Sequence, residues 1–182
     1  MDHLKHQSNT ALSVFFALLG LILVLRSFAE KWNVTLAWWL IALNHAFIAL
    51  AVSFNEHFTY NHVVLYLSGV LLSVMFGHGV LARLKKYEGP LSLHHFQGHV
   101  YEHKKLTLAF LICGLGISGF PITTSFIGED LIFSHIHENQ WLLATLIALS
   151  FIVDGLAMVR IYSRVFLGPH AKTYHEIAYR SS

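Results

Sequence analysis

The sequence predicts an all-α integral membrane protein with about five transmembrane helices, the fourth of them discontinuous. Three observations lead to this fold class. Only 12% of the 182 residues are charged and 55% are hydrophobic, whereas a soluble domain carries about 25% charged residues. The hydrophobic residues form long blocks, each able to cross a bilayer core about 30 Å thick, and a proline interrupts the fourth block. The blocks cover residues 11–28, 34–54, 63–82, 106–135 (broken near 121) and 141–167.

We therefore expect one membrane domain over residues 1–182, without a separate soluble domain. The first block is interpreted as a retained helix and not as a cleaved signal peptide. Ser27-Phe28-Ala29 has the small-x-small pattern of a cleavage site, but Arg26 stands directly before it. A signal peptide carries its positive charge ahead of the apolar run.

The basic residues predict the orientation in the membrane. With five spans, all Lys and Arg residues except Lys5 fall on one side. Short loops rich in Lys and Arg stay cytoplasmic. The amino terminus is therefore expected outside and the carboxyl terminus inside a bacterial-type inner (plasma) membrane. The residues on the cytoplasmic side are Arg26, Lys31, Arg83, Lys85, Lys86, Lys104, Lys105, Arg160, Arg164, Lys172 and Arg180.

The longest cytoplasmic loop, residues 83–105, is predicted to contain a short amphipathic helix on the membrane surface. A turn signal at Gly89-Pro90 precedes apolar residues at roughly helical spacing. These are Leu93, Phe96, Val100 and Tyr101. Histidines also repeat along one face of this helix, at His95, His99 and His103, with His94 and Glu102 beside them. Because one helix rarely completes a zinc tetrahedron, we expect a solvated or partner-contacting face and no metal site.

The fourth block carries the most specific signal. An unbroken helix over residues 106–135 would be about 45 Å long, well beyond the hydrocarbon thickness. Pro121 lacks an N–H group and clashes with the preceding turn, and Gly119 weakens the helix before it. We predict a break there, with the hydroxyl residues 123–125 capping a second half-helix. Such a break must be surrounded by protein or by a water-filled cavity.

Two carboxylates, Glu129 and Asp130, follow the break. An ionisable residue inside a membrane span is costly, and this makes it a functional candidate. Adjacent helix positions point about 100° apart, so only one of the two is expected to face the bundle, and Glu129 is preferred. The alternative is that both lie at the outer headgroup level and merely end the helix.

Three further residues are candidates for a proton path: His45 in the second span, His78 in the third and Asp154 deep in the fifth. Histidine titrates near neutral pH and can relay protons. The alternative for each histidine is a hydrogen bond between helices. For Asp154 it is an ion pair with a cation such as Arg160.

Two segments of the fourth block are LGISGFP at 115–121 and SFIGEDL at 125–131. They resemble the discontinuous helix of the proton-conducting antiporter-like family. This family includes the large membrane subunits of respiratory complex I, the Mrp antiporters, membrane-bound hydrogenases and the membrane subunit of the DAB inorganic-carbon system. The following span resembles the next family helix and ends in RIYSRVFLGP at 160–169. The resemblance covers residues 105–169.

The resemblance implies two inverted repeats of five helices in a full-length member, each with its fourth helix broken. This chain is similar to the second repeat alone, and Glu129 occupies the family's proton-path position. The resemblance therefore implies a proton- or cation-translocating half-subunit of a larger complex, energising inorganic-carbon uptake or a redox complex. The expected partners are a full-length antiporter-like subunit and a soluble catalytic subunit.

Two rival functions are weighed against transport. One is a structural adaptor that docks a larger partner without conducting ions. The other is a haem anchor using His45 and His78, but these residues lie about 9 Å apart along the membrane normal, which argues against a shared iron. The sequence also contains no nucleophile–base constellation and no phosphate-binding glycine loop. We therefore expect no cofactor, no nucleic-acid partner and no enzyme acting alone.

Overall fold

The computed structural model describes residues 2–55, 58–121 and 123–169, and in this part of the chain it contains only helices and loops. Lys172 and Arg180, which were used for the orientation, lie outside the described residues. The elements, in chain order, are α1 (Asp2–Ala29), α2 (Val34–Val52), α3 (Tyr60–Glu88), the single 3-10 turn η1 (His99–Tyr101), α4 (Lys104–Ile117), α5 (Thr124–Ser134) and α6 (Trp141–Phe166).

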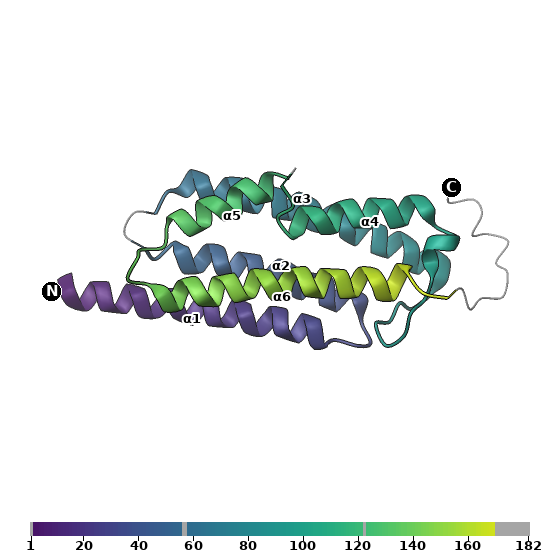
Figure 1. The fold of residues 1–182 in the computed structure, drawn as a ribbon, viewed down its shortest axis with the longest axis horizontal. Coiled ribbons are helices and arrows are strands. Elements are labelled where there is room, and N and C mark those ends of the chain that lie inside the picture. The colour runs from purple at the N-terminus through teal and green to yellow at the C-terminus, as the bar shows by residue number, and fades with distance from the viewer. Residues whose placement is uncertain (1, 56–57, 122, 170–182) are drawn as a thin grey trace.

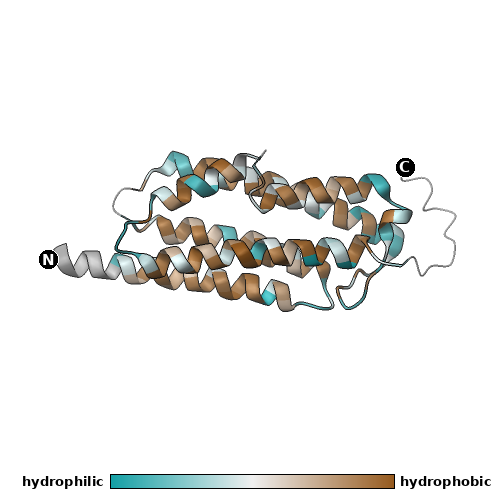
Figure 2. Ribbon diagram, viewed as in Figure 1, coloured by the Kyte–Doolittle hydropathy of each residue, from teal (hydrophilic) through white to brown (hydrophobic). Residues whose placement is uncertain are grey.

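The all-α membrane fold with a discontinuous fourth helix is confirmed. Among the described residues, four helices are long and apolar enough to cross a membrane: the Asn9–Ala29 part of α1, and the whole of α2, α3 and α6. The shorter helices α4 and α5 follow one another along α3, and together they make the fourth crossing (Figure 1). Most of the helical ribbon carries the colour of hydrophobic residues, whereas hydrophilic residues are more frequent toward the loops at both ends (Figure 2).

The helices form two layers (Figure 1). One layer contains α1, α2 and α6, and the other contains α3 with α4 and α5. Aromatic side chains join the layers, since the ring of Phe110 on α4 lies 4.9 Å from Trp38 on α2 and 5.2 Å from Phe166 on α6. All three side chains are fully buried. Large apolar side chains such as Phe76 and Val159 point outward, as expected of a surface that faces lipid.

The prediction of an amphipathic surface helix within residues 83–105 is wrong. α3 continues to Glu88, and residues 89–98 form no helix before the single turn of η1. Gly89 and Gly98 have positive φ angles of 79° and 68°, a conformation that stops a right-handed helix. The loop instead crosses the end of the bundle, where its backbone N–H groups at Leu93 and Gln97 donate to the carbonyls of Lys31 and Arg164.

The same end of the bundle collects the predicted cytoplasmic residues. The carboxyl ends of α1, α3 and α6 meet the amino end of α4 there (Figure 1). These helix ends carry Arg26, Lys85, Lys86, Arg164, Lys104 and Lys105. The charge pattern and the helix directions therefore agree with each other, and the sidedness of the membrane remains a prediction.

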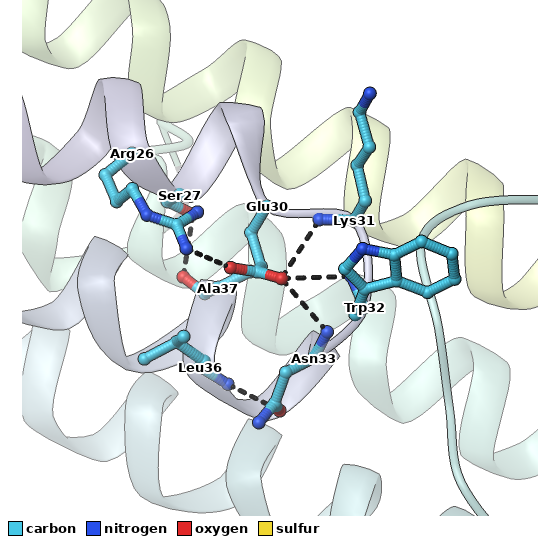
Figure 3. A network of polar contacts seen from close by, with 8 residues as sticks. All are labelled: Arg26, Ser27, Glu30, Lys31, Trp32, Asn33, Leu36 and Ala37. Atoms are coloured by element: carbon cyan, nitrogen blue, oxygen red, sulfur yellow. Dashed lines mark hydrogen bonds and ion pairs between the residues drawn. The ribbon is translucent and has the colours of Figure 1, made fainter.

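Glu30 organises the tight turn between α1 and α2 at this end (Figure 3). Its Oε1 accepts hydrogen bonds from the backbone N–H groups of Lys31, Trp32 and Asn33, at 3.1, 2.9 and 3.3 Å. Its Oε2 lies 2.7 Å from a guanidinium nitrogen of Arg26. The Trp32 N–H group, followed by the Asn33 N–H group and Arg26, lowers the pKa of the Glu30 carboxyl below its ordinary value.

Candidate functional site

The break in the fourth crossing lies between Ile117 and Thr124. Gly119 takes a left-handed φ of 62°, which turns the chain out of α4 before Pro121 is reached. The N–H group of Phe120 then donates to the carbonyl of Leu115 at 3.0 Å, a longer loop than an α-helix closes. The carbonyl of Gly116, which would bond Phe120 in a continuous helix, is left available.

Ser125 on α5 forms a hydrogen bond with that carbonyl group. Its buried hydroxyl donates a short hydrogen bond to the Gly116 oxygen, so that the two half-helices are joined across the break. The Thr123 hydroxyl donates to the carbonyl of Phe120 at 2.7 Å, and although Thr123 is the N-cap residue of α5, it makes no capping bond. The expectation that these hydroxyls cap α5 is therefore corrected for Thr123 and Ser125: they bond a carbonyl within the break and one at the end of α4.

Glu129 lies on α5 with its carboxyl group against the break. A Cβ atom built on Gly119 would overlap this carboxyl group, so the glycine provides the space it occupies. Glu129 is half-buried, and its Oε1 is a buried atom without a hydrogen-bond partner among the described residues. The neighbouring Asp130 is exposed. The adjacent carboxylates thus face different surroundings, and Glu129 is the one that points into the protein.

His45, Tyr66 and Asp154 meet inside the bundle from three helices. The Nδ1 atom of His45 on α2 lies 2.6 Å from the hydroxyl oxygen of Tyr66 on α3. The Nε2 atom of the same ring lies 3.5 Å from Oδ1 of Asp154 on α6. All three residues are buried. Phe151, one turn before Asp154, packs its ring against both His45 and Tyr66, which fixes the orientation of the imidazole.

A close helix contact brings Glu129 to this group. A Cβ atom built on Gly128 would overlap the backbone of Tyr66, so α5 approaches α3 as closely as glycine allows. Glu129, the next residue, interacts electrostatically with Tyr66, His45 and Asp154. We call His45, Tyr66, Glu129 and Asp154 the polar cluster. Its four members come from α2, α3, α5 and α6 and comprise two carboxyl groups, an imidazole and a phenol, each of which is able to bind or release a proton.

Tyr66 is the member that sequence reasoning missed. A tyrosine in an apolar span is common, and nothing in its neighbourhood along the chain distinguishes it. A second difference from the sequence analysis concerns Asp154, whose alternative role there was an ion pair with Arg160. The guanidinium carbon of Arg160 lies 5.7 Å from the ring centroid of Phe28, whereas Asp154 faces His45.

His78 lies outside the polar cluster. It is half-buried on α3, and its ring packs against Trp39 at a centroid distance of 5.4 Å. The two ring nitrogens of His45 already face Tyr66 and Asp154. His45 therefore offers no nitrogen to an iron shared with His78, and this geometry adds to the argument against a haem site.

A second polar group lies at the opposite end of the bundle from Glu30. Nδ1 of His62 at the start of α3 lies 3.2 Å from Nε2 of His135, which follows α5. The side-chain amide of Asn55 donates to the His135 carbonyl at 2.8 Å and to Gln140 Oε1 at 3.0 Å. This network joins the loop after α2 to the loop before α6, on the side where α5 ends.

Comparison with known proteins adds information about the fold. Protein-family models and curated protein sequences give no match to the chain. Among solved structures, it is similar to a chain of respiratory complex I from Thermus thermophilus with bound NADH, with a TM-score of 0.72 and 19% identity. The similarity covers 93% of this chain and 36% of that one, so this chain spans little more than a third of its length. At this identity the likeness establishes a shared fold.

Proposed function

We propose that this chain is a proton- or cation-translocating half-subunit of a larger, respiratory-type membrane complex. The observation that carries the proposal is the position of Glu129, which reaches the polar cluster from a half-helix that begins at a break. Carboxylates buried in a membrane protein are rare and costly, and where they persist they mark ion pathways. The fold similarity to part of a chain of respiratory complex I supports the same assignment.

The polar cluster is suited to pass protons because the side chain of every member can bind or release a proton or share one in a hydrogen bond. The Glu129 carboxyl takes up a proton beside the break and releases it toward His45 and Asp154. The imidazole of His45 carries a proton on either nitrogen, with Asp154 at one and the Tyr66 hydroxyl at the other. Tyr66 can donate its own proton while accepting another, so that it returns to its starting state after each transfer.

A complete path requires a partner. Transporters of this architecture place their sites between two repeats, and the chain provides the equivalent of one. We propose a full-length antiporter-like subunit as the membrane partner, together with a soluble catalytic subunit. The complex would lie in a bacterial-type inner membrane, with the amino terminus outside, and would energise inorganic-carbon uptake or a redox reaction.

The test is transport by the intact complex, purified with its partners and reconstituted into liposomes containing a pH-sensitive dye. Glu129→Gln keeps the shape of the side chain and removes its exchangeable proton. We expect proton movement to fall on the order of 100-fold, the low end of what a positioned proton-transfer group contributes. The matched control is Asp130→Asn, which alters the adjacent exposed carboxylate and should leave the rate near that of the unmodified complex.

Unchanged transport in the Glu129→Gln complex would contradict the proposal. It would favour a non-conducting adaptor, whose role is to dock a larger partner. Measuring assembly of the complex distinguishes the two functions. If the chain is an adaptor, substitutions on its outer surface should dissociate the complex, whereas substitutions in the polar cluster should change neither assembly nor transport.

A further inference from the structure

Carboxylates and histidines that the proposed function does not use gather between α3 and α4. Glu88 is the last residue of α3, His99 begins η1, and Glu102 follows η1 directly. One ligand atom from each of the three lies within 4.8 Å of the other two. His103, the residue before α4, lies beside them. Residues separated along the chain by the loop 89–98 are thus brought to one point.

The burial of this group is unusual for charged residues. The side chain of Glu88 is 1% exposed and that of His99 is 3% exposed. A carboxylate so far from water is stable only when it is paired, hydrogen-bonded or bound to a cation. In Glu88, Oε1 lies 2.7 Å from Nε2 of His103, and Oε2 lies 3.7 Å from Nδ1 of His99, so both carboxylate oxygens face a histidine.

The spacing fits two ligands of one ion. Zinc bonds of about 2.1 Å at a tetrahedral angle place the ligand atoms roughly 3.4 Å apart. The 3.7 Å between Glu88 and His99 is close to that value, and the three ligand atoms, which lie within 4.8 Å of one another, would have to approach by up to about 1.4 Å on binding an ion. The donor set also narrows the choice of ion, because Mg²⁺ and Ca²⁺ favour oxygen ligands alone, whereas imidazole nitrogen suits Zn²⁺ and other divalent transition metals.

His103 holds Glu88 in position for such a site. Its Nε2 lies 2.7 Å from Oε1 of Glu88, so that the other oxygen, Oε2, is turned toward His99. Ligating carboxylates in metal sites are commonly held by a hydrogen bond of this kind. The aromatic ring of Tyr87 stacks on His103 at a centroid distance of 5.5 Å and limits the movement of the imidazole.

We propose that Glu88, His99 and Glu102 form a Zn²⁺ site, with His103 as a positioning residue. Two carboxylates balance the charge of the ion, and three protein ligands leave one coordination position for water or for a group from a partner. The ion would join the end of α3 to the start of α4. The nearby lysines at 85, 86, 104 and 105 are exposed, and water and salt screen their repulsion.

The test uses the full chain, freed of metal by chelation and then dialysed against Zn²⁺, with bound metal measured by mass spectrometry. Co²⁺ replacing zinc gives a visible absorption band that reports nitrogen and oxygen coordination. We expect one tightly bound ion per chain, and its loss in Glu102→Gln and His99→Ala. His103→Gln should weaken binding about 10- to 100-fold, the usual effect of an outer-shell residue.

His95→Ala is the matched control, because His95 is an exposed histidine of the same loop and lies outside the ligand set. It should bind zinc as the unmodified chain does. Equal zinc binding by the control and by Glu102→Gln would overturn the proposal, as would a folded chain that retains no zinc. If His99→Ala fails to fold, Glu102→Gln decides the question, since it alters a half-buried residue isosterically.

Discussion

Nε2 of His45 on α2 lies 3.5 Å from Oδ1 of Asp154 on α6, and both side chains are almost completely buried. The pair joins two helices across the bundle. A buried polar contact of this kind adds little net stability, but removing one partner leaves the other buried and unsatisfied. The same contact therefore links the folding of the chain to the proposed proton path.

His45→Phe tests this link. The substitution leaves Asp154 buried without its partner, so we expect a loss of about 1–3 kcal/mol in the free energy of unfolding. His45→Phe combined with Asp154→Asn replaces the buried carboxyl group by an amide, which costs less to bury unpaired, and should recover part of that loss, although neither variant should translocate protons. Denaturant unfolding in detergent measures the stabilities, and the idea fails if the single variant is as stable as the double variant.

Gly128→Ala tests the close approach of α5 to α3. A methyl group at this position overlaps the Tyr66 backbone and pushes the helices apart, at a cost of about 1–3 kcal/mol for an overpacked contact. Gly79→Ala on α3 is the control, since a Cβ atom there has no neighbour within 4 Å. Thermal unfolding should show a lower Tm for Gly128→Ala and an unchanged or higher Tm for Gly79→Ala.

Ser125→Ala tests the join between the half-helices. Without the hydroxyl, the Gly116 carbonyl loses its partner across the break, at a cost of about 0.6–2 kcal/mol for a hydrogen bond within a membrane protein. Ser134→Ala is a suitable comparison, because the exposed Ser134 hydroxyl bonds the Leu131 carbonyl of its own helix. Hydrogen exchange at the start of α5 should increase in Ser125→Ala alone; equal exchange in both variants would contradict a bridging role.

The lowered pKa of the Glu30 carboxyl predicts that the stability of the fold depends on pH. Because the pKa of its carboxyl in the folded state is lowered from the ordinary value of 4.5, the folded state favours the charged form. Its contribution is present above the unfolded pKa and is lost as the pH falls through the folded pKa. Glu30→Gln should therefore be less stable than the unmodified chain at pH 7, with a difference that shrinks below about pH 4.5. Denaturant titrations at several pH values measure this, and a difference that is constant with pH would disprove it.

Much of the fold is readable along the chain. Long apolar blocks, a shortage of charge and the pair Gly119 and Pro121 predict a membrane bundle with a broken fourth crossing, because each is a local property of consecutive residues. Local helix geometry also predicts that only one of Glu129 and Asp130 faces the protein, but it does not decide which of the two. The surface helix predicted over the loop 83–105 shows the limit of such reasoning, since apolar spacing there was outweighed by positive φ at Gly89 and Gly98.

What only the tertiary structure decided is which polar residues meet. His45 and His78 look alike in the sequence, yet one contacts Tyr66 and Asp154 and the other packs against Trp39. The difference depends on how each helix is rotated and how deep it sits, which side-chain packing between distant segments determines. Periodicity along one helix relates residues three or four apart and carries no information about the rotation of its neighbour. The approach of α5 to α3 at Gly128 is such a contact, and it brings Glu129 to the polar cluster.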